Sequence, residues 1–222
     1  AKKAAAFDVN AACSGFIYAL ATAYQFVAAG TYDNVLVVGS EVYSRILDWQ
    51  DRNTCVLFGD GAGAVVIQAS DSPPGSLGFV LGNDGAGADI LYTPGPCGLN
   101  DGRYFLTMKG QEVFRFAVNI VCQATKQAVD AAHLELSDID LIIPHQANTR
   151  ILKSAARLLD LPLDKFFINV DRYGNTSAAS IPIALCEAIE EGRVKDGDHL
   201  VLVGFGGGLS WAAMVIEWGP GD

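Results

Sequence analysis

Four features of this sequence could do chemistry together: a cysteine, a histidine, an asparagine and a run of glycines. Cys13 lies in the small-residue stretch Asn10-Ala11-Ala12-Cys13-Ser14-Gly15, between an apolar run and a long apolar helix. His145, Asn175 and the glycines 206–208 each follow a stretch that reads as a strand. A thiol nucleophile, an imidazole, a carboxamide and backbone N–H donors are the groups that acyl transfer requires. We therefore expect acyl transfer through Cys13.

The position of Cys13 favours a reactive thiol. We expect a buried strand over residues 4–9, a turn, and then a helix from Ser14 to about Ala29, with Gly30 just past its end. At the start of a helix, free N–H groups and the positive end of the dipole favour thiolate over thiol. The small neighbours leave room for an acyl group.

Each of these features also has a purely structural interpretation. Cys13 could be a small buried hydrophobic residue, and His145 a hydrogen-bonded structural histidine. Asn175, in Tyr-Gly-Asn, suits a turn, and the glycine run could serve close packing alone. Taken singly, none of the four residue patterns excludes the structural interpretation.

The elements that must position these residues alternate between strands and helices, which predicts an α/β fold with parallel strands. Residues 4–9, the following helix and residues 35–39 read as one βαβ unit. Catalytic groups in such folds collect outside the carboxyl ends of strands. Further strands are expected at 65–67, 141–144, 166–170, 199–205 and 210–218, and further helices at 112–132, 148–159 and 178–190.

Two local patterns bear on the organisation of the chain. The glycine-rich stretch 58–64 leads into a strand, whereas a phosphate or dinucleotide loop leads into a helix, so both nucleotide-binding readings are rejected. The stretch 70–76, with Pro73 and Pro74, is the best linker. A weak echo between 35–67 and 200–216, strand, glycine bend and strand, suggests two related halves.

Composition excludes several classes of function. The chain has 222 residues, is 50% hydrophobic and carries a net charge of −10, which argues against general nucleic-acid binding. Its five cysteines show no CxxC spacing, which favours a reducing compartment and argues against a metal site. No membrane span or signal peptide is recognisable. Because an apolar strand would begin almost at residue 4, we expect this chain to be part of something longer.

The chemically competent residues sit in five motifs that occur in a fixed order. Together they resemble the β-ketoacyl-acyl-carrier-protein synthase III family, the initiating condensing enzymes of type II fatty acid synthesis. The motifs are Asp8-Val9-Asn10-Ala11-Ala12-Cys13-Ser14-Gly15-Phe16, Phe58-Gly59-Asp60-Gly61-Ala62-Gly63-Ala64, His145-Gln146-Ala147-Asn148, Tyr173-Gly174-Asn175-Thr176-Ser177 and Gly204-Phe205-Gly206-Gly207-Gly208.

The resemblance implies a thiolase-like fold, two similar halves in a five-layered α/β/α/β/α arrangement, working as a homodimer in the cytoplasm. The first half, incomplete in this chain, would comprise residues 1–72 and carry Cys13. The second half, residues 73–222, would carry the histidine, the asparagine and the glycine bend. Family members begin well before the strand that leads to the cysteine.

The resemblance also implies roles. Cys13 would accept the acyl group of an acyl-CoA primer, usually acetyl-CoA. His145 and Asn175 would hydrogen-bond the thioester carbonyl of malonyl-acyl carrier protein, and the N–H groups of Cys13 and Gly207 would form the oxyanion hole. No metal or redox cofactor is implied. Matching positions near the CoA or pantetheine arm are Arg52, Gln111 and Asn148, and those of the primer pocket wall are Phe58 and Leu106.

Carrier-protein docking would need a local basic patch, because acyl carrier proteins are acidic and so is this chain. Arg150, Lys153 and Arg157 fall at i, i+3 and i+7 of the expected helix 148–159, which places them on one face. Arg150 also matches a position implicated in carrier binding in the family. An ordinary solvated helix face would show the same charges.

Related enzymes differ at single positions. Thiolases carry a second cysteine where Gly204-Phe205 stand here, and elongating synthases carry a histidine at position 175. Chalcone synthase-like enzymes share the Cys-His-Asn set but usually have a proline in the glycine run, and HMG-CoA synthase has an additional catalytic acid. A chalcone synthase-like polyketide synthase remains an alternative, as does an inactive fragment or partner-binding subunit.

Overall fold

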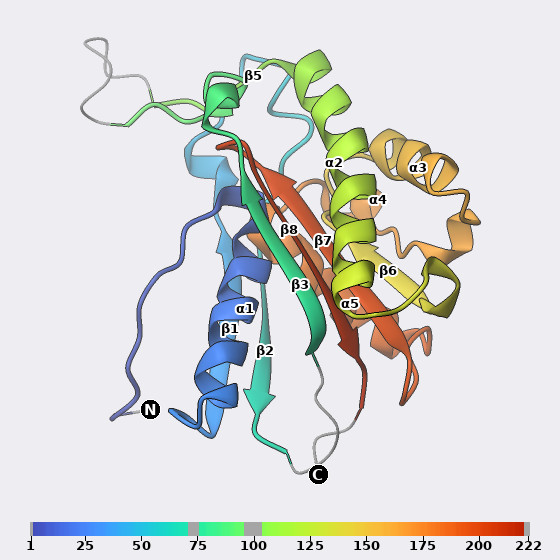
Figure 1. Cartoon of the computed structure of the whole chain (residues 1–222). Helices are drawn as coiled ribbons and strands as arrows, with labels where there is room; N and C mark the ends of the chain where they lie inside the picture. Colours follow the sequence, from blue (N-terminus) through green and yellow to red (C-terminus); the bar gives the residue numbers. More distant parts are fainter. Residues whose placement is uncertain (1, 71–75, 96–103, 220–222) are drawn as a thin grey trace.

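A computed structural model describes residues 2–70, 76–95 and 104–219 (Figure 1). The expected linker at Pro73-Pro74 and the side chain of Cys97 lie outside the described residues. Within them, none of the helices combines the length and apolar character needed to span a membrane.

The centre of the structure is a four-stranded sheet of order β3-β8-β7-β6. β6 (Leu141–Pro144) and β7 (His199–Gly206) are parallel, whereas β8 (Ser210–Glu217) runs antiparallel to both β7 and β3 (Ser76–Asn83). The sequences of β6 and β7 are continuous apolar runs, as expected for strands covered on both faces. Their side chains are almost entirely buried.

Helices cover both faces of this sheet. α2 (Gly110–Ala131) packs on β3, β7 and β8, and α3 (Thr149–Leu158) packs on α2. α1 (Gly15–Ala28) and α5 (Ser180–Glu190) lie on the opposite face (Figure 1). Each helix turns an apolar stripe inward, and the fully buried alanines of α2 let it approach the sheet closely.

A second, two-stranded sheet packs on the outer side of α1 and α5. β1 (Asn34–Glu41) and β2 (Gly61–Gln68) pair antiparallel, with Leu36 opposite Val66. Gly39 is required for this packing, because a Cβ there would lie 2.3 Å from the carbonyl oxygen of Ala178. The outer face, with Leu36, Val38 and Val66, is exposed. The described residues therefore form four layers, β/α/β/α.

The ends of the four long helices lie within two residues of those predicted from the sequence. α1 ends where Gly30 was expected to stop it: Gly30 has φ +67°, and the N–H of Thr31 donates to the carbonyl of Phe26. This is the Schellman arrangement, which needs a left-handed residue. The remaining short elements are η1 (Ala12–Ser14), η2 (Tyr43–Arg45), η3 (Gly85–Gly87), β4 (Leu91–Tyr92), β5 (Thr107–Met108), η4 (Leu136–Asp138), η5 (Leu163–Lys165), α4 (Val170–Tyr173) and η6 (Ser177–Ala179).

Two expected strands are wrong. Residues 4–9 are extended but unpaired and almost wholly exposed, because no described strand lies beside them to complete a ladder. The βαβ unit is therefore absent from the described residues, and β1 pairs antiparallel with β2 instead. Residues 166–170 make one isolated bridge, between Phe166 and Ile142, and then enter α4. The echo between 35–67 and 200–216 does correspond to two antiparallel strand pairs.

Candidate active site

The turn that carries Cys13 is fixed by two buried serines. Cys13 lies in η1 directly before α1, after Ala12, which has φ +49°. The hydroxyl of Ser14 donates to the carbonyl of Ala11 at 2.7 Å and lies 2.8 Å from the hydroxyl of Ser210. Ser210 Oγ is also 2.9 Å from the same carbonyl of Ala11. The turn that carries Cys13 is thus tied to the start of β8, almost two hundred residues away in sequence.

The glycine run lies directly against Cys13. A Cβ on Gly206, the last residue of β7, would lie 2.6 Å from the backbone nitrogen of Cys13 and 3.0 Å from its Cβ. Only a glycine fits in that space. Gly207, assigned to the oxyanion hole by the resemblance, approaches the carbonyl oxygen of Leu91, which would lie 2.7 Å from an added Cβ. The glycine run therefore allows close packing against Cys13 itself.

The thiol of Cys13 is only 2% exposed and faces two hydroxyl groups. Ser177 Oγ donates to its sulfur at 3.4 Å, and Tyr43 Oη lies 3.6 Å from it. Burial raises the pKa of Cys13, although these hydroxyls oppose the rise. The net direction is opposite to the one expected from the helix start alone, because removal from water outweighs the local donors.

His145 follows β6, as expected, and is held on both sides. Its backbone N–H donates to the carbonyl of Val203 at 2.7 Å, and its ring packs edge-on against Phe205 with centroids 5.2 Å apart. Nδ1 lies 2.7 Å from Ser180 Oγ, at the start of α5. Burial lowers the pKa of His145 to about 3, so the imidazole is neutral near pH 7.

The hydroxyl of Ser180 is placed to hydrogen-bond that imidazole. Ser180 Oγ accepts the backbone N–H of Gln146 at 3.3 Å. Its own proton can then be donated to Nδ1 of His145, 2.7 Å away. In the tautomer that accepts this proton, the ring proton is on Nε2, which is then a hydrogen-bond donor.

Asn175 is positioned through its backbone as well as its side chain. Its N–H donates to Leu57 at 2.8 Å and its carbonyl accepts from Gly59 at 2.9 Å, so segment 57–59 lies beside it. Its Oδ1 accepts the N–H of Ser177 at 2.9 Å. With the oxygen occupied, the Nδ2 amino group is the part left to donate. Asn175 reaches the site after α4 and not, as expected, from the end of a strand.

Ser177 joins two of the expected catalytic residues. Its N–H orients the amide of Asn175 and its hydroxyl contacts the sulfur of Cys13. Phe205 and Gly206, adjacent in β7, touch His145 and Cys13 respectively. The structure therefore brings the cysteine, histidine, asparagine and glycine run to one place.

Sequence reasoning missed three hydroxyl residues of this site: Tyr43, Ser177 and Ser180. The two serines follow Asn175 by two and five residues, so the Thr-Ser-Ala-Ala-Ser string after the asparagine was an available signal. Tyr43 lies in a mixed loop segment and carries no such signal, because only the fold brings it to Cys13.

Of the positions expected to contact substrate, Phe58 and Leu106 lie in one cluster with Tyr43, beside Cys13. The ring of Phe58 packs against that of Tyr43 at an interplanar angle of 56°, and Leu106 is buried in the same cluster with Leu47. Asn148 caps α3, its side chain accepting the N–H of Arg150. Arg52 and Gln111 are exposed. For these positions the roles in substrate binding stay predictions.

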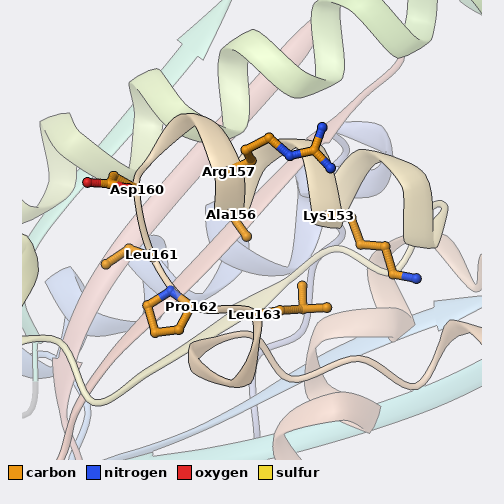
Figure 2. A pocket seen from close by; sticks show the side chains of 7 residues that line it. All are labelled: Lys153, Ala156, Arg157, Asp160, Leu161, Pro162 and Leu163. Carbon is orange, nitrogen blue, oxygen red and sulfur yellow. The ribbon is translucent and has the colours of Figure 1, made fainter.

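The expected basic face is exposed on α3. Arg150, Lys153 and Arg157 all lie at the surface, and the last two border a shallow hollow with Leu163. Figure 2 shows the two basic side chains along the helix and Asp160 at its end. Across the described part of the chain, no group of three or more His, Cys, Asp or Glu side chains could hold a metal ion.

Comparison with known proteins gives matches over most of the chain. Residues 7–85 match the sequence model of 3-oxoacyl-[acyl-carrier-protein (ACP)] synthase III, and residues 129–218 match that of its C-terminal part. β-Ketoacyl-[acyl-carrier-protein] synthase III of Desulfitobacterium hafniense is 51% identical, over 98% of this chain and 68% of its own length. The enzyme of the same name from Roseiflexus castenholzii is 50% identical, over 100% of this chain and 69% of its own length.

The three-dimensional comparison agrees. The crystal structure of β-ketoacyl-[acyl carrier protein] synthase III from Thermus thermophilus superposes with a TM-score of 0.93 at 50% identity, covering 98% of this chain and 69% of that one. The chain thus spans about two thirds of the length of these relatives and has their thiolase-like fold. It belongs to the β-ketoacyl-[acyl-carrier-protein] synthase III family.

Proposed function

We propose that this chain carries the acyltransferase site of an initiating condensing enzyme. It joins an acyl-CoA primer, acetyl-CoA in the simplest case, to malonyl-acyl carrier protein in a decarboxylative Claisen condensation. The product is a 3-oxoacyl-acyl carrier protein, the first intermediate of fatty acid synthesis. The observation that carries the proposal is the convergence of Cys13, His145 and Asn175 through Ser177 and the glycines of β7.

In the first half-reaction the sulfur of Cys13 attacks the thioester carbonyl of the primer. A carbon–sulfur bond forms to Cys13, the bond to the CoA sulfur breaks, and the cysteine proton ends on the CoA thiol. The N–H groups of Cys13 and Gly207 stabilise the tetrahedral oxyanion, a role supported by the contact of Gly206 with the cysteine backbone. The narrow space at Gly206 keeps this loop against the nucleophile.

In the second half-reaction His145 and Asn175 act on the malonyl thioester. Nε2–H and Nδ2–H donate to its carbonyl oxygen while the carbon–carbon bond to carbon dioxide breaks and its electrons form the enolate. The enolate carbon then attacks the acyl group on Cys13. The new carbon–carbon bond forms as the bond to Sγ breaks, and the cysteine sulfur is released. Burial keeps His145 neutral, and a neutral imidazole can donate a hydrogen bond to the carbonyl oxygen while keeping its proton.

The direct experiment is acylation in the absence of malonyl substrate. The chain is incubated with acetyl-CoA, and its cysteine-containing peptides are mapped by mass spectrometry. We expect one acetyl group on Cys13, none in a Cys13→Ser variant, and a 3-oxoacyl product once malonyl-acyl carrier protein is added. Acetylation at Cys55, Cys122 or Cys186 with Cys13 free would refute the proposal. Acylation of Cys13 without formation of the 3-oxoacyl product would favour the alternative that this chain is a fragment unable to catalyse the second half-reaction.

The carrier protein docks, in this proposal, on the face of α3 formed by Arg150, Lys153 and Arg157. An Arg150→Glu/Lys153→Glu double variant should then weaken use of malonyl-acyl carrier protein and flatten its salt dependence. Lys126→Glu/Lys195→Glu makes the same charge change on other exposed positions and serves as the control. Equal carrier kinetics in the two double variants would exclude this face.

The remaining parts of the proposal concern assembly. Residues 1–72 would form the first thiolase-like part and 73–222 the second, supported by the separate sheets β1–β2 and β3-β8-β7-β6. The family supports a homodimer. The free thiols of Cys13, Cys55, Cys122 and Cys186 support a reducing compartment such as the cytoplasm. Light scattering on the purified chain measures its oligomeric state, and a strictly monomeric active enzyme would contradict the dimer.

A further inference from the structure

We propose that Tyr43 is a further catalytic residue, whose hydroxyl donates a hydrogen bond to the sulfur of Cys13 and stabilises the thiolate that attacks the acyl-CoA. Ser177 supplies the second hydroxyl donor to the same atom. The proposal rests on the role of Cys13 as the nucleophile given above.

The geometry holds the Tyr43 hydroxyl at the sulfur. Tyr43 Oη lies 3.6 Å from Cys13 Sγ, and the side chain is 6% exposed. Its ring packs on Phe58 with centroids 4.7 Å apart and lies in one cluster with Leu47 and Leu106. A ring enclosed in this way cannot turn its hydroxyl out to water.

The hydroxyl of Tyr43 holds its proton more firmly than an ordinary tyrosine does and is therefore available as a donor. Burial raises its pKa well above the usual value for tyrosine, and the neighbouring cysteine raises it further, whereas a hydrogen bond with the hydroxyl of Ser177 opposes the rise only in part. The phenol therefore keeps its proton while the thiol loses its own. A hydrogen bond from a neutral donor to an anion is stronger than the same bond to a neutral acceptor. The pair Tyr43–Cys13 consequently favours the thiolate.

Such a donor is needed because the other surroundings oppose the thiolate. Burial raises the pKa of Cys13, and the carboxylate of Glu41 at the end of β1 adds to the rise. His145 is neutral near pH 7, so it gives no compensating positive charge. What lowers the pKa of Cys13 is hydrogen bonding, from Ser177, from Tyr43 and from its own N–H.

Apart from Glu41 on β1, no charged side chain acts on the sulfur from the described elements that contact η1, namely α1, β7, β8 and η6. β7 and β8 meet η1 at Gly206 and Ser210, whereas their ionisable residues, His199 and Glu217, pair at the opposite end of the two strands. On α1, the hydroxyl of Tyr18 donates to the carbonyl of Gly82 and so points elsewhere. η6 contributes Ser177 itself.

The expected effect of Tyr43→Phe follows from two opposing factors. Losing one hydrogen bond to an anion lowers the thiolate population at pH 7 by about 10-fold to 100-fold. The thiolate that remains is more nucleophilic, with a Brønsted coefficient of about 0.4–0.5, which recovers roughly half of that loss on a logarithmic scale. The acylation rate at pH 7 should therefore fall about 3-fold to 10-fold. At a pH where both proteins are fully ionised, the variant should react as fast as wild type or faster.

The test measures how fast iodoacetamide alkylates Cys13 as a function of pH, followed on the Cys13 peptide of the full chain. Tyr43→Phe should move the profile to higher pH, and Ser177→Ala should move it in the same direction. Tyr18→Phe removes a hydroxyl that bonds elsewhere and should leave the profile unchanged. Cys55, measured in the same samples, is an internal reference. If Tyr43→Phe does not fold, Tyr43→Leu gives the same readout, since both lack the hydroxyl.

The outcomes are distinct. Superimposable profiles for wild type and Tyr43→Phe, or a loss that is equal at every pH, would overturn the assignment, since displaced packing alone lowers the rate without moving the profile. A shifted alkylation profile in a protein that acetyl-CoA does not acylate would uphold the hydrogen bond from Tyr43 to the Cys13 thiolate and refute the proposed function. If acetyl-CoA acylates wild type but Tyr43→Phe leaves the alkylation profile unshifted, the proposed function stands and the role of Tyr43 is refuted.

Discussion

The amide of Asn175 gives the sharpest separation of the two half-reactions. Its Oδ1 is fixed by the N–H of Ser177, and its backbone is paired on both sides with Leu57 and Gly59. Asn175→Asp keeps the shape and the acceptor for Ser177 but replaces the Nδ2 donor by a second acceptor with negative charge. Asn175→Ala removes the donor without adding a charge. Comparing the two variants therefore separates the loss of condensation rate due to the missing donor from the loss due to the added negative charge.

The magnitudes can be ranked. Loss of one donor to a developing oxyanion costs about 10²–10³ in rate. A carboxylate about 4 Å from the enolate adds a repulsion of roughly 4 kcal/mol at an effective dielectric constant of about 20. Even with part of this removed by protonation of the aspartate, we expect condensation to fall in the order wild type, Asn175→Ala, Asn175→Asp, with at least about tenfold between the variants. Acetyl transfer from CoA to Cys13 should change little.

The assay follows both half-reactions on each protein. Acetylation of Cys13 is measured by mass, and release of carbon dioxide from the malonyl thioester by a radiolabel. Asn34→Asp makes the same chemical change at an exposed position at the start of β1 and is the control. Decarboxylation by Asn175→Asp within tenfold of wild type would refute the donor role. An equal loss in both half-reactions would show that Asn175 only supports the fold around Cys13.

Three further changes test the surroundings of the site. Gly206→Ala puts a methyl group 2.6 Å from the backbone nitrogen of Cys13, so it should cost about 1–3 kcal/mol of unfolding free energy and most of the acylation rate, whereas Gly85→Ala, with nothing within 4 Å, should cost neither. Ser180→Ala should lower decarboxylation by about tenfold and spare acylation, because Nδ1 of His145 loses its hydrogen-bond partner and the ring its orientation; equal losses in both reactions would contradict this. His145 should also make the fold acid-sensitive, because its pKa is about 3 in the folded protein and about 6.5 in the unfolded chain. Between these two values the unfolded chain binds the extra proton, so the free energy of unfolding decreases as the pH is lowered. Denaturant titrations should show wild type losing about 2 kcal/mol more than His145→Gln between pH 7 and 5, and equal losses would refute the shift.

Local sequence patterns were sufficient for the helices and for His145. The continuous apolar run before His145 could only be a buried strand, and its carboxyl end is where the fold presents functional groups. Gly30 stops α1 for a reason that lies within a few residues. Such features depend on neighbours in sequence, and the structure agrees with them.

Features that depend on distant contacts could not be predicted in the same way. The apolar pattern of residues 4–9 is that of a strand, yet a strand needs a partner, and none of the described strands lies beside it. Asn175 is placed by its bridge to Phe58 and not by a preceding strand. The pKa of Cys13 depends on burial under side chains that are remote in sequence, so the helix start alone gave the wrong direction.

The contacts that build the site also determine what must stay together. Cys13, from the first part of the chain, touches Gly206 and Ser177 from the last third, and Ser14 is tied to Ser210. A change at Gly206 or Ser210 should therefore act on the nucleophile without touching substrate. The boundary proposed near residue 72 accordingly divides the sheets but not the active site, because the reactive cysteine has no complete environment until the C-terminal strands are in place.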